Sequence, residues 1–507
     1  MNEDVLEKLT VAPVEPKPGP DSGPDTPHHG EDQILYWNDV ALEADRVDHT
    51  PEPDQQPQQA GPLLCSRALA IVHLAMYDAY AGVVNNPTDL PTYRDLSNLT
   101  PPPFSESAAN VAIAAAAHTA LSALYPRQRA SFDTAHTNAG LGGGLQPGHT
   151  FGVRVAQRML AERAGDPPVS ASGYTHSLER GKHRVDPDNP GQGFYGPIYG
   201  DLSHGFAITD RHQLDAPPFD NPEYLAALKQ VRYKGIAPEL LATLPPNSSL
   251  PPHSSPRTAE ETLIGIYWGY DGARGLGTPP RLYNQIVRVV AKAKKNDVSQ
   301  NARLFAFVNA AMADAGILAW EQKYLHNLWR PVLGIREHSV LPNPLDPDAD
   351  PFWLPLGAPR TNGDRNPPIN GKNFTPNFPA YPSGHATFGA AALHMTRLFY
   401  GVTGTCPDKL FKGLSFVSDE FNGVNRDIQG TVRPPHARSF PGGLWDMIIE
   451  NSRSRIFLGV HWSFDGFAVD DEGNPDLERN IGGVPLGLKI AEDIFNAGDC
   501  IAPKKPA

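Results

Sequence analysis

The chain has 507 residues but only three cysteines, and this scarcity excludes two kinds of stabilised protein. Cys65, Cys406 and Cys500 are an odd number, and their spacing matches no familiar metal-binding pattern. We therefore expect neither a disulfide framework nor a metal site built from thiolates.

Long apolar runs are scarce as well. No stretch approaches about 18 uncharged apolar residues, the length that crosses a bilayer. The N-terminus is acidic and has no apolar segment of the kind that a classical signal peptide needs. The sequence therefore predicts a soluble protein without a membrane span, either cytoplasmic or exported by a non-classical route.

Positive charge is outnumbered, with 43 Lys and Arg against 56 Asp and Glu and a net charge of −13. A field of this sign disfavours nucleic acids and anionic membranes as partners. Hydrophobic residues make up 40% of the chain, which is enough for a large core. We expect a globular protein that acts on small molecules, and the sequence leaves open whether it forms a homo-oligomer.

The hydrophobic pattern predicts an all-α fold with two related helical bundles, long loops and an irregular N-terminal arm. The predicted units are a Pro-rich arm over 1–62, a first bundle over 63–165, a loop-rich connection over 166–256 and a second bundle over 257–507. Helices are expected over 63–81, 108–124, 126–137, 150–164, 258–270, 279–295, 299–329, 384–400, 441–458 and 484–496.

An internal echo suggests that the two bundles arose by duplication. The segment from Arg67 to Ala79 matches the segment from Arg303 to Ala315 at an offset of 236, including the pair Asp78 and Asp314. Gly152 and its neighbours resemble the stretch around Gly487, although alanine-rich helices also match by composition alone. Only the second half carries a candidate site, because Gly148-His149 lacks the serine of Ser383-Gly384-His385.

That candidate site begins at Tyr381-Pro382-Ser383-Gly384-His385, where a loop gives way to an Ala- and Leu-rich helix. Serine is a good N-cap, and the first amides of a helix have no partner within it. We expect the Ser383 and Gly384 amides to point outward unpaired, beside the imidazole of His385. This arrangement is typical of an anion-binding site.

Two other segments supply cations. Lys323 and Arg330 are seven residues apart, which places them on nearly the same helix face, and Pro331 should turn Arg330 out of the helix end. Arg455 and His461 are six apart and could meet one ligand only if the helix breaks between them, for which Gly459 is suited.

Taken singly, each of these features also fits an ordinary structural explanation. Lys and Arg at a spacing of seven are typical of a solvated helix face, and a Ser-Gly pair is typical of a simple cap. His461 next to Trp462 could be a core histidine, and Asp271 before glycine fits a turn. The joint occurrence of three motifs in one order favours a functional site.

The three motifs read Lys-x6-Arg-Pro, Pro-Ser-Gly-His and Ser-Arg-x5-His-x3-Asp. This order resembles the superfamily shared by the vanadium-dependent haloperoxidases and the type 2 phosphatidic acid phosphatases. The long insertion after His385, the segment from Gly430 through Trp462 and the segment from Trp268 to Gln285 are more similar to haloperoxidases of the chloroperoxidase type. The resemblance covers roughly residues 63–497.

The resemblance implies vanadate, as V(V), for a cofactor, with neither haem nor flavin. By the same resemblance, the vanadate oxygens are held by Lys323, Arg330, Ser383, Gly384 and Arg455 and the vanadium by His461. His385 would be the general acid–base, Lys323 would polarise bound peroxide, Asp271 would pair with Arg455, and Asp465 would orient His461. Hydrogen peroxide would then oxidise a halide to hypohalous acid, which halogenates small organic nucleophiles.

Two aromatic residues bear on halide choice. The resemblance implies that Trp320 and Phe378 wall the vanadate pocket, as in chloroperoxidase-like members, whereas algal bromoperoxidase-like members carry Arg and His there. We therefore expect oxidation of chloride as well as bromide. Lys323 and the arginines should depress the pKa of His385, so activity should fall on acidification, with a mildly acidic optimum.

Two alternative functions follow from the same residues. The first is a soluble acid phosphatase, in which His461 forms a phosphohistidine and no metal is needed. The second is a non-enzymatic helical scaffold that retains a relic site.

Overall fold

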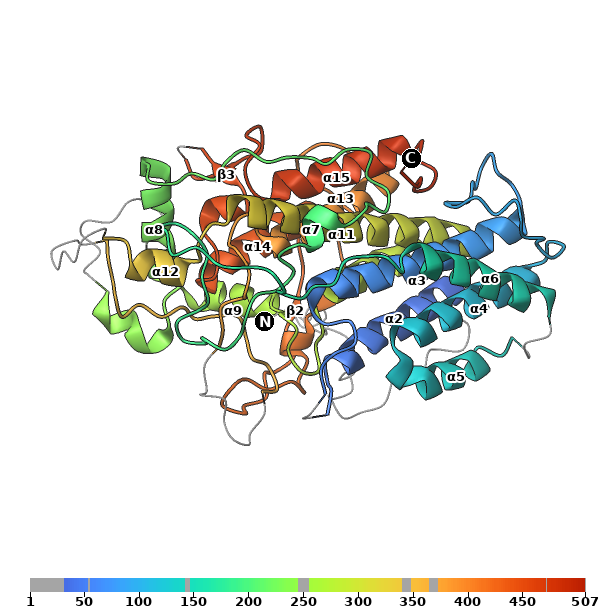
Figure 1. Cartoon of the computed structure of the whole chain (residues 1–507), viewed down its shortest axis with the longest axis horizontal. Coiled ribbons are helices and arrows are strands. Elements are labelled where there is room, and N and C mark those ends of the chain that lie inside the picture. Colours follow the sequence, from blue (N-terminus) through green and yellow to red (C-terminus); the bar gives the residue numbers. More distant parts are fainter. Residues whose placement is uncertain are drawn as a thin grey trace, which may run out of the picture.

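A computed structural model describes residues 32–52, 55–141, 146–244, 255–339, 348–363, 373–470 and 472–506. The fold is all-α, as predicted, with two related helical bundles (Figure 1). Its helices are α2 (Gln33–Asp48), α3 (Gly61–Val84), α4 (Glu106–Leu124), α5 (Arg129–Asn138), α6 (Pro147–Glu162), α7 (Tyr199–Leu202), α8 (Pro222–Lys234), α9 (Ala259–Tyr267), α10 (Pro279–Lys294), α11 (Val298–His326), α12 (Pro331–Arg336), α13 (Gly384–Phe399), α14 (Gly443–Phe457) and α15 (Gly483–Ala497).

Strands are confined to two short antiparallel pairs among these residues. β1 (Phe416–Val417) pairs with β2 (Ala437–Arg438), and β3 (Ala468–Val469) pairs with β4 (Pro475–Asp476). In the described part of the chain, short 3₁₀ helices cover Pro126–Gln128, Pro238–Thr243, Asp419–Phe421 and Ser463–Asp465. The core is therefore built from helix against helix.

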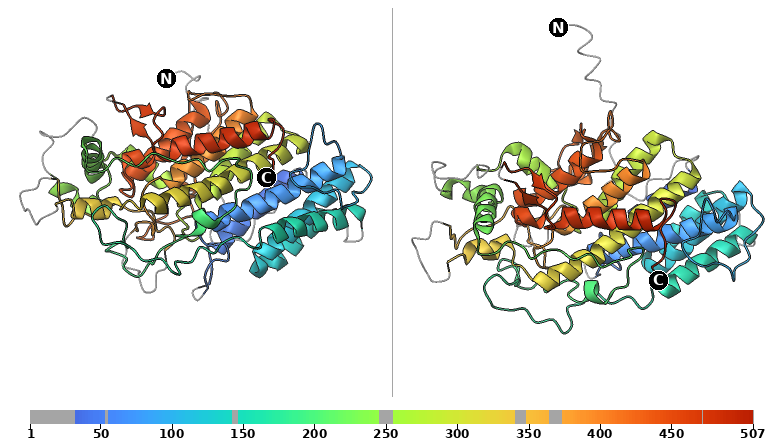
Figure 2. Two further views of the ribbon diagram at one scale, coloured as in Figure 1. Left: turned by 45° about the horizontal axis from the view of Figure 1, so that its top comes forward. Right: turned by 90° about the horizontal axis from the view of Figure 1, so that it is seen from above.

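The two bundles lie side by side, and α3 packs along α11 where they meet. The blue and teal helices α2 to α6 lie together at one end of the molecule, and α11, α13, α14 and α15 run beside them through its centre (Figures 1 and 2). The contacts repeat: α3 packs on α4 and α6, and α4 packs on α6; α11 packs on α13 and α15, and α13 packs on α15.

Matching glycines allow the equivalent helix pairs to approach closely. A Cβ atom on Gly152 of α6 would lie 2.2 Å from the Ala112 carbonyl oxygen of α4. A Cβ atom on Gly487 of α15 would lie 2.5 Å from the Thr387 carbonyl oxygen of α13. A side chain at either position would push the paired helices apart. The resemblance between the Gly152 and Gly487 segments therefore reflects equivalent packing as well as composition.

The matched polar residues also make equivalent contacts. Arg67 donates to the Arg163 carbonyl at the end of α6, and Arg303 donates to the Cys500 carbonyl beyond α15. The carboxylate of Asp78 accepts the backbone N–H of Tyr93, and that of Asp314 accepts three successive backbone N–H groups from 206–208. Both carboxylates thus anchor a crossing loop with backbone hydrogen bonds.

The predicted irregular arm was wrong in its second half. Residues 1–31 lie outside the described residues, but residues 33–48 form α2, which Asp32 caps by accepting the Leu35 N–H at 2.8 Å. The helix is buried on most sides because it packs against both bundles. Its sequence lacks the amphipathic stripe of a surface helix, so periodicity did not reveal it. The remaining domain boundaries stay predictions.

The long connection holds one full helix, α8, and α12 follows the first site motif; neither was predicted. Two helices bear on the prediction that the chain has no membrane span. By length and composition alone, α4 and α11 are long and apolar enough to cross a membrane. However, 94% of the apolar window of α11 is buried inside the protein, so core packing accounts for its composition.

Candidate active site

A cavity of about 130 Å³ lies where the start of α3, the loop before α10, and the helices α11, α13 and α14 converge. Seven of the predicted site residues line it: Asp271, Trp320, Phe378, Gly384, His385, Arg455 and His461. Further lining comes from Gly61, Pro62, Tyr195, Gly272, Thr278, Pro279, Phe374, Pro376, Asn377 and Phe388. Lys323, Arg330, Ser383 and Asp465 lie behind this surface and contact the lining residues or the loops that carry them.

The start of α13 brings the second motif to the cavity. Ser383 is the N-cap, and its hydroxyl accepts the Ala386 N–H at 3.4 Å. The expectation of two outward amides was wrong for Ser383, because its N–H donates to the Asp465 carbonyl at 2.8 Å. Gly384 is the first residue of the helix, so its N–H has no acceptor within α13. The Ser383 amide thus ties the second motif to the third.

Lys323 is fully buried near the end of α11. Its ammonium donates to the carbonyls of Pro379 at 2.9 Å, Ala380 at 3.1 Å and Pro382. Burial, reinforced by the charge of Arg330, holds the pKa of Lys323 well below its usual range. The lysine therefore anchors the loop that leads into α13, and its side-chain nitrogen lies behind the cavity wall.

Arg330 leaves the helix as the sequence predicts. Helix α11 ends at His326, Asn327 takes a left-handed conformation with φ of 52°, and Arg330 becomes the N-cap of α12. The guanidinium donates to the carbonyls of Phe378 at 2.8 Å and Val460 at 2.7 Å and to His461 Nε2 at 2.9 Å.

The break at Gly459 places His461 beside Arg455, as predicted. Gly459 has φ of 73°, and a Cβ atom there would lie 2.5 Å from the Gly235 carbonyl oxygen, so both conformation and space require glycine. Helix α14 ends at Phe457, and the chain turns sharply before His461. In a continuous helix Arg455 and His461 would lie on different faces. Because the helix is broken, both side chains line one cavity.

The hydrogen bonds of His461 define its tautomer. Nδ1 lies 2.7 Å from Asp465 Oδ2 and Nε2 lies 2.9 Å from the Arg330 guanidinium, which can only donate. Burial and the charge of Arg330 hold the pKa of His461 well below its usual range, while burial raises the pKa of Asp465 to about 7. The imidazole is therefore neutral, with its proton on Nδ1 and a lone pair on Nε2.

The imidazole of His385 is held by the loop before α10, because its Nε2 lies 2.7 Å from the Gly269 carbonyl oxygen. The His385 carbonyl in turn accepts bonds from Tyr283 at 3.0 Å and Asn451 at 2.8 Å. The pKa of His385 is lowered to about 4, which agrees with the predicted direction of the shift. The main cause is burial, followed by Arg455, rather than the charge of Lys323.

Arg455 and Asp271 form the predicted ion pair, with two hydrogen bonds of 3.1 and 2.7 Å. The arginine side chain is 1% exposed and the carboxylate 7% exposed, so the ion pair is almost completely shielded from solvent. A bidentate pair of this kind fixes the guanidinium plane. Asp271 thus controls where the Arg455 charge lies in the cavity wall.

Trp320 and Phe378 form an aromatic wall, with ring centroids 4.7 Å apart. The Lys323 ammonium lies 5.1 Å from the Phe378 centroid, and the Arg330 guanidinium carbon lies 5.0 Å from it. The Phe378 ring therefore lies close to two of the cations as well as lining the cavity.

The residues present fit an oxyanion such as vanadate. Arg330 Nη2 and Arg455 Nε are buried and have no hydrogen-bond partner among the described residues, an expensive arrangement unless an acceptor binds. No cluster of three or more His, Cys, Asp or Glu in the described part of the chain could hold a metal ion. The donor set therefore suits a metal that arrives surrounded by its own oxygens.

Some residues of the site carried no sequence signal. Tyr195 donates from its hydroxyl to the Ala60 carbonyl at 2.7 Å, and its ring packs against Trp320 and Phe378. It lies in an irregular loop far from the motifs, so only the folded structure brings it to the cavity. Tyr283 and Asn451 were missed for the same reason, because their role depends on contacts between helices.

Both halves of the chain resemble known vanadium chloroperoxidase domains. A family model described as the vanadium chloroperoxidase N-terminal domain matches residues 24–194, and one described as the vanadium chloroperoxidase second helical-bundle domain matches residues 303–475. The vanadium chloroperoxidase of Curvularia inaequalis is 35% identical over 575 aligned positions, which cover 92% of this chain and 90% of that protein.

Solved structures agree with this fold. A bacterial vanadium-dependent iodoperoxidase has a TM-score of 0.58 at 18% identity, covering 92% of this chain and 96% of its own. The holo form of a bacterial vanadium-dependent chloroperoxidase also has a TM-score of 0.58, at 15% identity, covering 89% of this chain and 96% of its own.

Proposed function

The chain belongs to the vanadium chloroperoxidase family, and we propose that its cavity binds vanadate and uses hydrogen peroxide to oxidise a halide to hypohalous acid. In this reaction the O–O bond breaks, two electrons leave the halide, and one oxygen departs as water after taking up protons. The observation that carries the proposal is the neutral His461 in the cavity wall beside Arg455, whose Nε2 lone pair faces the Arg330 guanidinium at 2.9 Å.

The proposed binding mode uses residues that the sequence predicted. His461 Nε2 would bind vanadium, while Arg330, Arg455, the Gly384 amide and the charge of Lys323 would balance the oxyanion. Ser383 would contribute by holding the start of α13 in place. When bound, vanadate supplies a Lewis acid that polarises peroxide oxygen without a change in oxidation state.

His385 would move protons at Nδ1, because Nε2 is occupied by the Gly269 carbonyl. Asp271 would hold Arg455 in place, and Asp465 would keep the proton of His461 on Nδ1. The Trp320 and Phe378 wall favours chloride as well as bromide as the halide. Hypohalous acid would then halogenate small organic nucleophiles.

The proposed setting is that of a soluble enzyme without haem or flavin. Two features support it: the acidic net charge and the burial of the two apolar helices inside the fold. Nucleic acid and membrane surfaces are not proposed as partners.

The test is to add orthovanadate to metal-free protein and measure halogenation of monochlorodimedone with peroxide and bromide or chloride. Activity should appear with vanadate and disappear in His461→Ala. His118→Ala, which changes a histidine on α4 remote from the cavity, serves as the control. Fast release of phosphate from a chromogenic ester without vanadate, and no halide oxidation, would support the acid phosphatase with a phosphohistidine at His461 instead.

A further inference from the structure

The loop Gly269-Tyr270-Asp271-Gly272 contacts two of the residues that line the cavity, His385 and Arg455. Its Gly269 carbonyl binds His385 Nε2 at 2.7 Å, and two residues later the Asp271 carboxylate binds Arg455. The residue between them, Tyr270, has φ of 52°. A bulky side chain rarely adopts this left-handed conformation, so surrounding contacts must hold it there.

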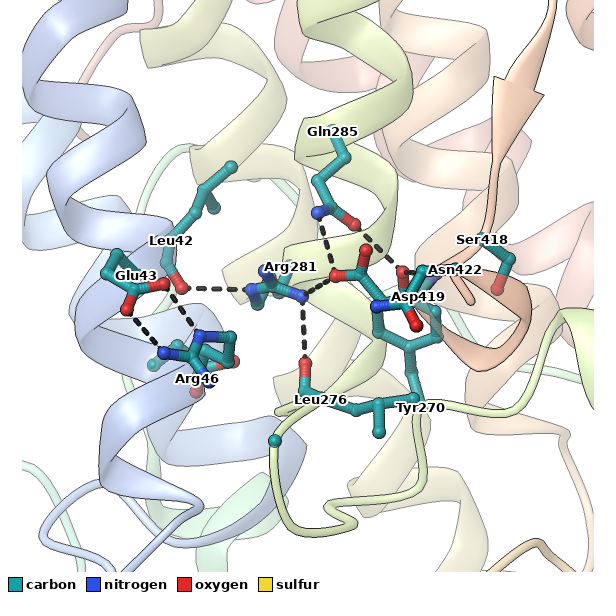
Figure 3. Close-up of polar contacts among 12 residues, drawn as sticks. Leu42, Glu43, Arg46, Tyr270, Leu276, Arg281, Gln285, Ser418, Asp419 and Asn422 are labelled. Atoms are coloured by element: carbon teal, nitrogen blue, oxygen red, sulfur yellow. Dashed lines mark hydrogen bonds and ion pairs between the residues drawn. The ribbon is translucent and has the colours of Figure 1, made fainter. Parts of the chain in front are cut away.

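One set of contacts holds the Tyr270 side chain, which is completely buried. Its hydroxyl donates to Gln285 Oε1 at 3.0 Å and accepts the backbone N–H of Asp419 at 2.7 Å (Figure 3). Gln285 also donates to the Asp419 carboxylate at 3.1 Å, which closes a ring of hydrogen bonds among three residues.

Arg281 connects this ring to the first half of the chain. Its guanidinium pairs with the Asp419 carboxylate at 2.5 Å and donates to the Leu42 carbonyl of α2 at 3.0 Å (Figure 3). It also donates to the Leu276 carbonyl at 3.0 Å, in the same connection that carries Tyr270 to α10. The ring is therefore anchored on α2, α10 and the 3₁₀ turn at Asp419.

A second set of contacts holds the backbone of the loop. Glu420 Oε1 accepts the Tyr270 N–H at 3.2 Å, and its other oxygen binds Thr361 and, at 2.6 Å, Arg433. A Cβ atom on Gly269 would lie 2.5 Å from Glu420 Oε1, so the carboxylate packs directly against the residue whose carbonyl binds His385.

We propose that Tyr270 is a positioning residue, held by the clamp of Gln285, Asp419 and Glu420, that sets the Gly269 carbonyl on His385 and the Asp271 carboxylate on Arg455 together. A single strained residue thereby couples the acid–base group to one of the oxyanion-binding cations. Its effect on catalysis rests on the haloperoxidase function proposed above, whereas its effect on the His385 ring does not.

The test compares Tyr270→Phe with Tyr77→Phe. The control removes the hydroxyl of another buried tyrosine, which donates to the Pro91 carbonyl at 2.6 Å in the first bundle. The primary measurement is the ¹⁵N NMR spectrum of His385 in protein without vanadate, assigned with His385→Ala. Tyr270→Phe should reduce the fraction of His385 protonated on Nε2, and Tyr77→Phe should leave it unchanged.

The second measurement is kinetic. At saturating vanadate, Tyr270→Phe should lower kcat for bromide oxidation by about 10- to 100-fold and weaken vanadate binding, as loss of partners around a metal site usually does. Unchanged His385 signals and kinetics equal to those of Tyr77→Phe would overturn the proposal. A shifted His385 signal in a protein that oxidises no halide would instead reject the proposed function and leave the positioning role standing.

A variant of the opposite partner covers the case in which Tyr270→Phe does not fold. Gln285→Met keeps a side chain of similar length but removes the acceptor of the Tyr270 hydroxyl, so it should shift the His385 signal in the same direction. If both variants are folded and neither changes the His385 signal, the clamp only stabilises the fold and the proposal is wrong.

Discussion

His461 Nδ1 lies 2.7 Å from Asp465 Oδ2, across the turn that follows the break at Gly459. The same carboxylate oxygen accepts the Trp462 N–H at 2.9 Å, so the acceptor is fixed from two directions. This contact assigns the proton to Nδ1 and leaves Nε2 with a lone pair, which accepts a hydrogen bond from Arg330 at 2.9 Å and is the atom that can bind a metal.

Asp465→Asn should weaken vanadate binding by about 10- to 100-fold, because an amide no longer favours the Nδ1–H tautomer of His461. Calorimetric titration of the metal-free protein with orthovanadate measures the effect. Asp470→Asn, which changes an aspartate of an exposed loop, should bind vanadate like the unmodified protein. Equal affinities in the two variants would show that Asp465 does not orient the ligand.

Bromide oxidation should lose activity as pH falls through about 4, and little of that loss should occur near pH 6.5. Proton transfer needs neutral His385, and burial lowers its pKa to about 4, so the neutral form persists in mildly acidic solution and is lost below that value. The profile of kcat/KM for bromide against pH reports this group. An acid limb centred between pH 6 and 7 would contradict the role of a buried His385.

Asp271→Asn should destabilise the protein by about 3 to 5 kcal/mol, since it leaves the buried Arg455 without its counter-charge. Glu223→Gln breaks the Arg479–Glu223 pair, whose side chains are 39% and 29% exposed, and should cost at most about 1 kcal/mol. Urea unfolding of both variants gives the comparison. Similar losses would mean that Arg455 is stabilised by groups other than Asp271.

Phe378→His should lower the ratio of chloride to bromide oxidation by about 10-fold, because a polar ring replaces part of the apolar wall. Phe378→Leu retains an apolar side chain and should change this ratio less. The ratio of kcat/KM values for the two halides, measured at saturating vanadate, separates the effect of polarity from that of size. A larger change in the leucine variant would indicate that ring shape sets halide preference.

Much of the site could be predicted because its determinants are local. A serine before an alanine-rich helix, a proline after Arg330 and a glycine before His461 each act within one or two turns of the chain. These signals predicted the N-cap at Ser383, the exit of Arg330 from α11 and the break that brings Arg455 and His461 together.

The rest depends on contacts between distant segments. The Ser383 amide bonds to the Asp465 carbonyl, Lys323 anchors three carbonyls of the loop before α13, and Tyr195 closes the cavity from a loop. Helix α2 was missed because it is buried on most sides and has no polar face to mark its period. Such features follow from packing, which a single sequence does not encode in its spacing.

The most direct test is a crystal structure of the protein soaked with orthovanadate, with anomalous scattering used to locate vanadium. We predict one vanadium bound to His461 Nε2, with Arg330 and Arg455 donating to its oxygens and His385 on the opposite side of the cavity. Vanadium bound elsewhere, or none in this cavity at concentrations that saturate activity, would contradict it.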